Sequence, residues 1–359
     1  MSSEFGKNLK VSIFGQSHGE AIGVVINGLP EGEKIDFEHL QAFLERRRGG
    51  KNAFSTKRAE KDIPRFLSGI VEGKTCGMPL AVIIENEDKR SGDYSEILDR
   101  PRPGHADLTA FLKWEGKADM RGGGHFSGRL TAPLCVAGGI AKQILARRGI
   151  HIGAHISEIY GISDERLPEF PSVSLFDEIE KKEFPVIDNE AGDKMKKAIT
   201  DASLELDSVG GIIECMAIGL PAGLGEPMFD GMENRLAYAL FGIPAVKGIE
   251  FGRGFEVAGL RGSENNDSYE MRDGEIVSPT NNAGGILGGI TSGAPIRLRV
   301  AVKPTPSIAR EQKTVSLSRL ENETLSIKGR HDPCIVPRAV PVVEAVVALV
   351  VLDSIIEGK

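Results

Sequence analysis

The segment 341–356 constrains the fold more than any other part of the chain. Its side chains are apolar on all sides except at Glu344 and Asp353. A helix that is apolar all round belongs in a protein core or a subunit interface, so the rest of the chain has to surround it. Its many valines also allow a β-strand, but Pro341 at a helix start favours the helix. We expect a buried C-terminal helix and an oligomeric protein.

The length and composition allow a core of that size. A chain of 359 residues with 40% hydrophobic content can enclose a long apolar helix. The four cysteines form no CxxC pair, so we expect neither a disulfide framework nor a metal site. No stretch has the roughly 18 uninterrupted apolar residues of a membrane span. These features predict a soluble protein of the reducing cytoplasm, without a membrane partner.

Charge is unevenly distributed along the chain. The net charge of −7 argues against a general nucleic-acid binder, which needs a basic face. Between Arg46 and Arg65, however, eight lysines and arginines stand against only Glu60 and Asp62. A basic segment on an acidic protein indicates a small polyanionic ligand. The alternative is a solvated charged loop.

Several helices are predictable from caps and apolar spacing. Asp36 as N-cap, an apolar stripe and Gly49 as stop predict a helix of about three turns. The range 133–149 gives a second helix, with proline near its first turn. Further helices are expected near the ranges 106–117, 190–206 and 230–242.

A strand–turn–helix plan occurs twice, from Ile22 and from Gly210. Each copy has an apolar strand, Gly-Leu-Pro-x-Gly, and an Asp before a helix. This repetition predicts one domain over 1–359 that contains two duplicated halves, approximately 1–160 and 200–359. The polar stretch 309–328 is expected to be a mobile loop or linker.

Four histidines lie in loops rich in glycine or proline: His18, His105, His125 and His331. Glycine beside an imidazole lets the ring approach a ligand closely. A structural or surface role is the alternative for each one alone. Their repetition in four such loops favours a shared site.

The loop "GQSHG" presents Ser17 and His18, which suit proton or hydrogen-bond donation to a departing oxyanion. A Ser-His nucleophile pair is the rival. Adjacent residues of an extended chain point to opposite sides, which disfavours that pair.

Two further loops combine arginine with a restrained backbone. In "RPRPGHAD", Arg102 precedes His105 among prolines, which predicts a rigid anion contact; a turn with solvated arginines is the alternative. In "RGGGHFSGR", three glycines with Ser127 and Arg129 predict a phosphate or cofactor edge. The spacing fits neither a dinucleotide fingerprint nor a P-loop.

The last two motifs lie near the C-terminus. "NNAGGILGGITSG" followed by "KPTPSI" offers a glycine face, hydroxyls and a lysine, which suit a flat ring with a phosphate tail; tight packing of the glycines is the alternative. "GRHDPC" holds Asp332 between His331 and Pro333, where the carboxylate serves as a base, an orienting group or a turn cap.

Together these loops resemble those of the chorismate synthase family, in the same order and over about 11–356. The resemblance implies an α+β fold of mixed β-sheets with packed helices, made of two similar halves. It implies a carbon–oxygen lyase that removes phosphate from 5-enolpyruvylshikimate-3-phosphate by anti-1,4-elimination. The product is chorismate, and the step is the last of the shikimate pathway to aromatic amino acids. The family needs reduced FMN, without net redox change.

The resemblance also assigns roles to residues at matching motif positions. The catalytic set is His18, His105 and Asp332. The substrate-binding set is Ser17, Arg47, Arg102, Arg129 and Arg330. The cofactor-binding set is Arg47, His125, Phe126, Ser127, Gly288, Lys303, Pro304, Thr305, Pro306, Ser307 and Arg330.

Two positions depart from the family pattern, and both remove charge near anionic ligands. His125-Phe126 stands where Arg-Ser is common, and Ala53 replaces an arginine, for which Lys51 or Lys57 is expected to compensate. No dinucleotide fingerprint is present, so reduction by an external flavin reductase is expected, with NADPH as an indirect reductant. The resemblance further implies a homotetramer.

Two rival functions stay open at this stage. One is a flavin oxidoreductase of another class, which would not need the arginines. The other is a non-enzymatic binder of phosphorylated metabolites or RNA.

Overall fold

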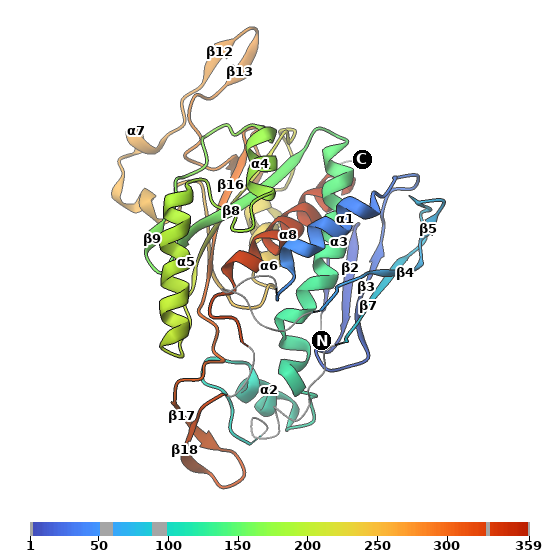
Figure 1. The fold of residues 1–359 in the computed structure, drawn as a ribbon. Coiled ribbons are helices and arrows are strands. Elements are labelled where there is room, and N and C mark those ends of the chain that lie inside the picture. Colours follow the sequence, from blue (N-terminus) through green and yellow to red (C-terminus); the bar gives the residue numbers. More distant parts are fainter. Residues whose placement is uncertain (1–2, 51–59, 88–98, 328–330, 358–359) are drawn as a thin grey trace.

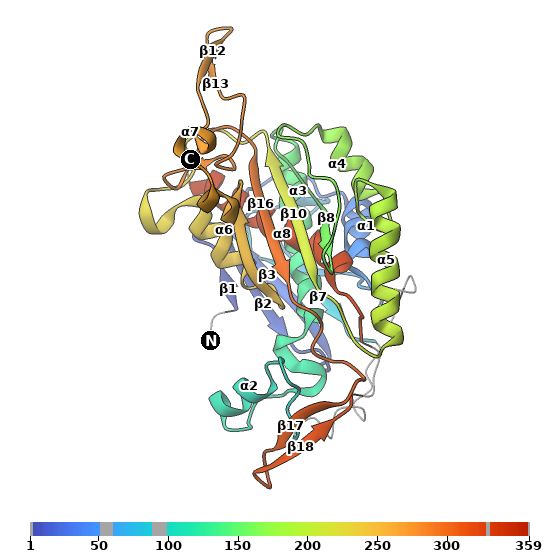
Figure 2. The same cartoon turned by 90° about the vertical axis from the view of Figure 1, so that its left-hand side faces the viewer.

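Two five-stranded sheets enclose a layer of helices (Figures 1 and 2). This computed structural model describes residues 3–50, 60–87, 99–327 and 331–357. The α+β class is as predicted. Every strand pairing in the described ranges is antiparallel, so the expectation of mixed sheets is wrong. Apolar alternation marks the buried face of a strand but carries no information on its direction.

The first sheet comes from the first quarter of the chain. Its strands, in spatial order, are β1 (Glu4–Phe5), β2 (Lys10–Gly15), β3 (Ala21–Asn27), β7 (Leu80–Glu85) and β4 (Arg65–Ser68). Alternate residues of the central strand β3, such as Ile22, Val24 and Ile26, are buried against the helices. The short hairpin of β5 (Ile70–Val71) and β6 (Lys74–Thr75) extends its edge.

The second sheet lies on the other side of the helices. Its order is β11 (Val246–Phe251), β16 (Ile296–Val302), β10 (Gly211–Ile218), β8 (His151–Ile159) and β9 (Ile162–Ser163). The inner face carries apolar residues such as Ile213, Cys215 and Leu298, all in the main core. The outer face is covered by α4 (Val173–Glu180) and α5 (Asn189–Leu204), as Figure 2 shows.

The helix layer consists of α1 (Phe37–Arg47), α3 (Thr131–Ala146), α6 (Met232–Leu240) and α8 (Val336–Glu357). The central helix is α8, which packs on α3 and on strands β8 and β10. Gly138 permits the close approach of α3, because an added Cβ would lie 2.3 Å from Cα of Ala345. The predicted buried C-terminal helix is confirmed, although it begins earlier than expected and Pro341 lies inside it.

Glu344 and Asp353, the two acidic residues inside the apolar segment of α8, have structural partners. Glu344 is buried and pairs with Arg46 at 2.7 Å and with Lys142. Asp353 accepts backbone hydrogen bonds from Lys7, Asn8 and Leu9, and so anchors the N-terminal segment to α8. By length and composition α8 is apolar enough to cross a membrane, yet 83% of its apolar window is buried inside the protein. Because Arg46 pairs with the buried Glu344, its charge serves the core and not a ligand.

The remaining predicted helices are present. Asp36 caps α1 by accepting a hydrogen bond from the backbone N–H of His39. The ranges predicted near 106–117, 190–206 and 230–242 correspond to α2 (Asp107–Trp114), α5 and α6. Short elements complete the described chain: η2 (Arg121–Phe126), η3 (Gly128–Leu130), η4 (Met228–Asp230), η5 (Gly254–Gly259), α7 (Gly262–Asn265), β12 (Glu270–Arg272), β13 (Glu275–Val277), β14 (Ile286–Leu287) and β15 (Ile290–Thr291).

Two sequence expectations about segments have different outcomes. The stretch 309–328 is not a linker, because β17 (Gln312–Ser316) pairs with β18 (Glu321–Leu325) in a protruding hairpin. Its polar residues on both faces hid the strand pattern. The repeated plan is visible as β3 followed by α1 and β10 followed by α6. Duplication of entire halves stays a prediction.

A buried charged cluster lies on the outer face of the second sheet. His155 sits between Asp164, at 3.0 Å, and Glu214, at 2.8 Å, and none of the three side chains is more than 1% exposed. Glu214 also accepts a hydrogen bond from Nε of Arg297. Burial alone would lower the pKa of His155, but the hydrogen bonds with Asp164 and Glu214 raise it above its ordinary value of 6.5. The cluster is therefore expected to hold a charged imidazole.

This cluster predicts a pH-dependent contribution to stability. Because the pKa of His155 is raised on folding, its stabilisation is complete below pH 6.5 and is lost as the pH rises through the folded-state value. The difference in unfolding free energy between the wild type and His155→Asn should shrink as the pH rises from 6 to 9 in urea titrations. His151→Asn, on the same strand, is the control. A difference that stays constant with pH would contradict a charged His155.

Candidate active site

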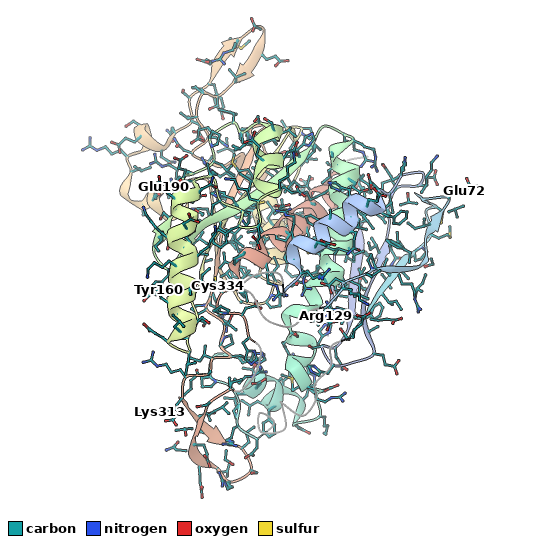
Figure 3. All side chains as sticks on the ribbon, in the orientation of Figure 1. Glu72, Arg129, Tyr160, Glu190, Lys313 and Cys334 are labelled. Atoms are coloured by element: carbon teal, nitrogen blue, oxygen red, sulfur yellow. The ribbon has the colours of Figure 1, made fainter. Side chains whose placement is uncertain are left out.

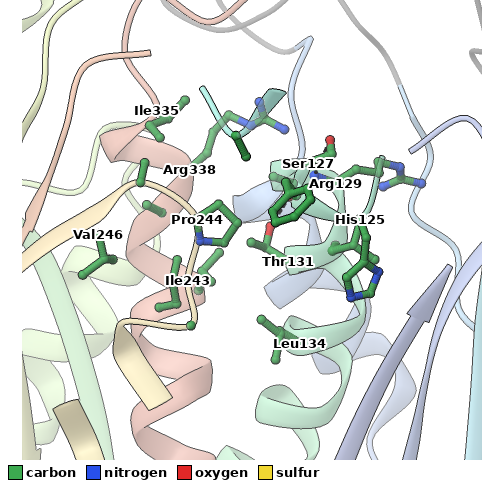
Figure 4. A pocket seen from close by; sticks show the side chains of 18 of the residues that line it. His125, Ser127, Arg129, Thr131, Leu134, Ile243, Pro244, Val246, Ile335 and Arg338 are labelled. Carbon is green, nitrogen blue, oxygen red and sulfur yellow. Dashed lines mark hydrogen bonds between the residues drawn. The ribbon is translucent and has the colours of Figure 1, made fainter. Parts of the chain in front are cut away.

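A cavity of about 980 Å³ opens between the helix layer and the two sheets. Figure 4 shows Arg129 and Arg338 at one end, where α3 and α8 begin, and Leu134, Ile243 and Val246 toward the other. Figure 3 places Arg129 in the middle of the molecule. Helix N-termini favour anions. One end of the cavity thus suits a charged group and the other an apolar ring.

Two predicted arginines share a carboxylate at the charged end. Arg47, in the last turn of α1, donates to Asp62 at 2.6 Å and to Oγ1 of Thr131 at 3.0 Å. Arg129, in η3, donates to the other oxygen of Asp62 and to Oδ1 of Asn86. Both guanidinium groups are 4% exposed. Burial alone would raise the pKa of Asp62, but Arg47 and Arg129 hold it below its usual range.

A second carboxylate holds the loop before α2. Asp107 accepts hydrogen bonds from Nε of Arg102 at 2.6 Å and from Nη2 at 2.8 Å. Nδ1 of His105 lies 2.7 Å from Asp107. Arg102 also donates to Oγ of Ser307 at 3.1 Å, which joins this loop to the segment 303–307. The two loops predicted to touch an anion and a cofactor are therefore neighbours.

The glycine-rich loop has a backbone that other residues rarely adopt. Gly122, Gly123 and Gly124 have φ of 61°, 88° and 54°. Gly122 lines the cavity, and a Cβ there would lie 2.1 Å from the ring of His18 and 3.0 Å from Oγ of Ser17. Ser17 and His18 thus lie directly behind Gly122, outside the lining itself. The expectation that they point to opposite sides is wrong, because the chain turns here and is not extended.

His125, Phe126 and Ser127 continue this loop along the cavity. Nδ1 of His125 lies 2.8 Å from the carbonyl oxygen of Gly15, and Nε2 lies 2.7 Å from Oγ of Ser3. The carbonyl can only accept, so Nδ1 carries the proton. The ring is thereby tied to the end of β2 and to the side chain of Ser3, just before β1. Ala53, Lys51 and Lys57 lie outside the described residues.

The segment after β16 forms the opposite wall. The cavity is lined here by Lys303, Thr305, Pro306 and Ser307. Pro304 lies between them in sequence but is not part of the lining. Oγ1 of Thr305 is buried and has no hydrogen-bond partner among the described residues. Burial lowers the pKa of Lys303, and nearby Lys247, also in the lining, lowers it further. An unpaired hydroxyl beside two lysines fits an anionic group.

Gly288 is not brought to this cavity. It lies in the turn between β14 and β15, and the neighbouring Gly289 accepts a hydrogen bond from the backbone N–H of Met232, where α6 begins. Phe241 and Gly242, which follow α6, line the cavity. The nine residues of α6 separate the two places by about 13 Å. A glycine-rich motif has a local signature that carries no information on this separation.

Asp332 lies in the loop just before α8 and lines the cavity. It accepts a hydrogen bond at 2.5 Å from Nη1 of Arg338, and Nε of Arg338 donates to the backbone carbonyl of Arg47 at 2.9 Å. The Asp332 side chain is 10% exposed. Arg338 therefore links Asp332 to the backbone of Arg47 at the charged end of the cavity. Arg330 lies outside the described residues.

Sequence reasoning missed the side chains that support the site. Asp62 and Arg338 stood in charged or apolar stretches without any motif of their own. Asp107 did stand inside "RPGHAD", where an acidic residue five positions after the proline-flanked Arg102 was an available signal. Such partners become evident only when their arginines are seen to be buried.

The fold and this cavity define an enzyme for a small, multiply charged anion. A family model described as chorismate synthase matches residues 9–356. The chorismate synthase of Pyrococcus abyssi is 50% identical over 352 residues, covering 98% of this chain and 97% of that protein. That of Lancefieldella parvula is 48% identical over 370 residues, covering 99% and 96%. The chain belongs to the chorismate synthase family, which consists of lyases.

A solved structure agrees with this assignment. A crystal structure of chorismate synthase matches with a TM-score of 0.78 at 29% identity, covering 98% of this chain and 93% of that chain. The resemblance inferred from the loops and the α+β class are thereby confirmed. The roles of individual residues stay predictions.

Proposed function

We propose that this protein converts 5-enolpyruvylshikimate-3-phosphate to chorismate by anti-1,4-elimination of phosphate, with reduced FMN as a cofactor that is not consumed. One observation carries the proposal. A single cavity gathers three buried arginines, an imidazole and a carboxylate, all from the motifs that resemble the family. A substrate with a phosphate and two carboxylates needs the arginines, and an elimination needs groups that give and take protons.

Arg47, Arg102 and Arg129 bind the phosphate and carboxylates of the substrate. Each guanidinium is already fixed by a buried carboxylate, Asp62 or Asp107, so little side-chain entropy is lost on binding. Each carboxylate uses part of the positive charge and leaves other N–H groups of the same arginine for the substrate. Arg330 is proposed to join this set.

The residues on the wall opposite fit a flavin phosphate. Thr305 has an unpaired buried hydroxyl, and the pKa of Lys303 is lowered by burial and by the nearby charge of Lys247, which a bound anion would offset. The apolar end of the cavity, with Leu134 and Ile243, suits the flat ring. Reduced FMN, when bound, supplies electron density to the allylic system that loses phosphate.

Three side chains of the chain handle protons. His18 gives a proton to the departing phosphate, from its place behind Gly122. His105 controls the protonation of the cofactor, and Asp332 takes the proton from the substrate carbon. His125 and Phe126 place a fixed imidazole and an aromatic ring at the cofactor edge, and Ser127 donates there. These roles suit an imidazole and a carboxylate near neutral pH.

The setting of the enzyme follows the family as well. We propose a cytoplasmic homotetramer that obtains reduced flavin from a separate flavin reductase, with NADPH as the indirect reductant. We keep in this proposal the predicted substrate role of Ser17 and the predicted cofactor roles of Gly288 and Pro304. Gly288 keeps its role despite its distance from the cavity.

The number of products formed for each flavin, and the oxidation state of the flavin, distinguish the proposal from the oxidoreductase rival. Under anaerobic conditions the enzyme receives excess substrate and a sub-stoichiometric amount of reduced FMN. We expect many phosphates released for each flavin, while the flavin absorbance stays that of the reduced form. One product for each flavin oxidised would instead support an oxidoreductase. Tight binding of the substrate with no phosphate release would support a binder.

A further inference from the structure

Asp107 contacts both of the functional side chains of its loop. Its oxygens lie 2.6 Å and 2.8 Å from Nε and Nη2 of Arg102, and 2.7 Å from Nδ1 of His105. The backbone N–H of Arg102 donates to it at 3.1 Å. The Asp107 side chain is 6% exposed and begins α2, where a helix N-terminus favours a negative charge. It is thus fixed from four directions.

This geometry decides which nitrogen of His105 carries a proton. Nη2 of Arg102 also lies 3.1 Å from Nδ1, and it can only donate, as can a protonated Nδ1. The carboxylate is closer and can only accept. Nδ1–H therefore donates to Asp107, and Nη2 of Arg102 donates to Asp107 as well. In the neutral ring the lone pair is left on Nε2.

Nε2 of His105 lies against the glycine-rich loop. A Cβ at Gly123 would lie 3.5 Å from Nε2, so this edge of the ring lies against the glycine-rich loop whose member Gly122 lines the cavity. His105 itself is in the lining. A basic Nε2 at this place can accept a proton from a bound ligand and return it.

We propose that Asp107 is a positioning residue that holds His105 in the Nδ1–H tautomer and keeps Arg102 in its binding orientation. The inference rests on the proposed function only in the proton-handling role of His105. Without Asp107 the ring is free to adopt the other tautomer, in which Nε2 carries the proton and cannot accept one.

The first test needs no variant. Nitrogen chemical shifts of the His105 ring, assigned by comparison with His105→Gln, report the tautomer in the intact protein at neutral pH, with and without reduced FMN. We expect a protonated Nδ1 and an unprotonated Nε2. A proton on Nε2 in the neutral ring overturns the proposal.

The second test uses Asp107→Asn, whose amide can donate to Nδ1 and still accept from Arg102. We expect a switch to the Nε2–H tautomer and a fall in kcat of about 100-fold, with KM raised less than tenfold. Asp99→Asn is the matched control, because Asp99 fastens the same loop to Ser316 and Ser318 without touching His105.

Two results would overturn the proposal even if Asp107→Asn loses activity. One is an unchanged His105 tautomer, and the other is a rise in KM with kcat preserved. Both would give Asp107 a purely structural or substrate-anchoring role. Failure of the wild type to form chorismate would contradict the proposed function instead, and the ring shifts would still report on the tautomer.

Discussion

Asp332→Asn is expected to lower kcat by roughly 10²- to 10⁴-fold while leaving substrate binding within a few-fold of the wild type. The carboxylate is the group proposed to take the substrate proton, and an amide cannot do so. The side chain keeps its size and its place in the loop before α8. Single-turnover phosphate release and equilibrium binding of the substrate measure the two quantities separately.

The ion pair with Arg338 provides the control for this experiment. Asp332→Asn leaves the Arg338 guanidinium, 21% exposed, without its carboxylate partner. The double variant Asp332→Asn/Arg338→Met removes both charges and tests whether the loss is electrostatic. If Asp332 takes the proton, the double variant stays inactive. Recovery of activity in the double variant would show that Asp332 only neutralises Arg338.

Asp62→Asn is expected to lower the free energy of unfolding by about 3 to 5 kcal/mol, the usual cost of breaking a buried ion pair. Asp62 is 2% exposed and bonds both Arg47 and Arg129, so an amide leaves two buried guanidinium groups facing each other. Burial opposes the charged form of Asp62, but the two arginines keep its pKa below the usual range. The contribution of the Asp62 carboxylate to the free energy of unfolding is therefore complete above pH 3.8. It is lost as the pH falls through the lowered pKa.

An exposed ion pair sets the scale for that result. Glu85→Gln breaks the pair with Arg65, in which both side chains are more than half exposed, and should change stability by less than about 1 kcal/mol. Inorganic phosphate should stabilise Asp62→Asn more than the wild type, because an anion can replace the lost carboxylate. Equal stabilisation of both proteins, or a cost no larger than that of Glu85→Gln, would contradict the shared role of Asp62.

Local signals in the sequence predicted local structure well. Asp36 forecasts the start of α1 because a cap acts within one turn, and the apolar run 341–356 forecasts a buried helix because no other place accepts it. The hairpin at 312–325 was missed, since its residues are polar on both faces. The antiparallel order of the second sheet depends on long crossovers, which no short pattern encodes.

The residues of the site likewise fall into those that local motifs predicted and those that they did not. Motifs with recognisable charged or proton-handling side chains predicted five residues that the fold brings to one cavity: Arg47, Arg102, His105, Arg129 and Asp332. Their partners Asp62 and Arg338 stood in no motif, because a counter-ion outside a motif is recognisable only from the burial of the charge it balances. Gly288 shows the converse, since a conspicuous loop lies a helix length away from the cavity.

The measurement that tests the central claim most directly is anaerobic turnover of 5-enolpyruvylshikimate-3-phosphate by the purified protein, with and without reduced FMN. Phosphate release and chorismate absorbance are followed together. Equal amounts of phosphate and chorismate, formed only when reduced FMN is present, are the predicted result. Absence of both products from a protein that binds reduced FMN and substrate would contradict the assigned reaction.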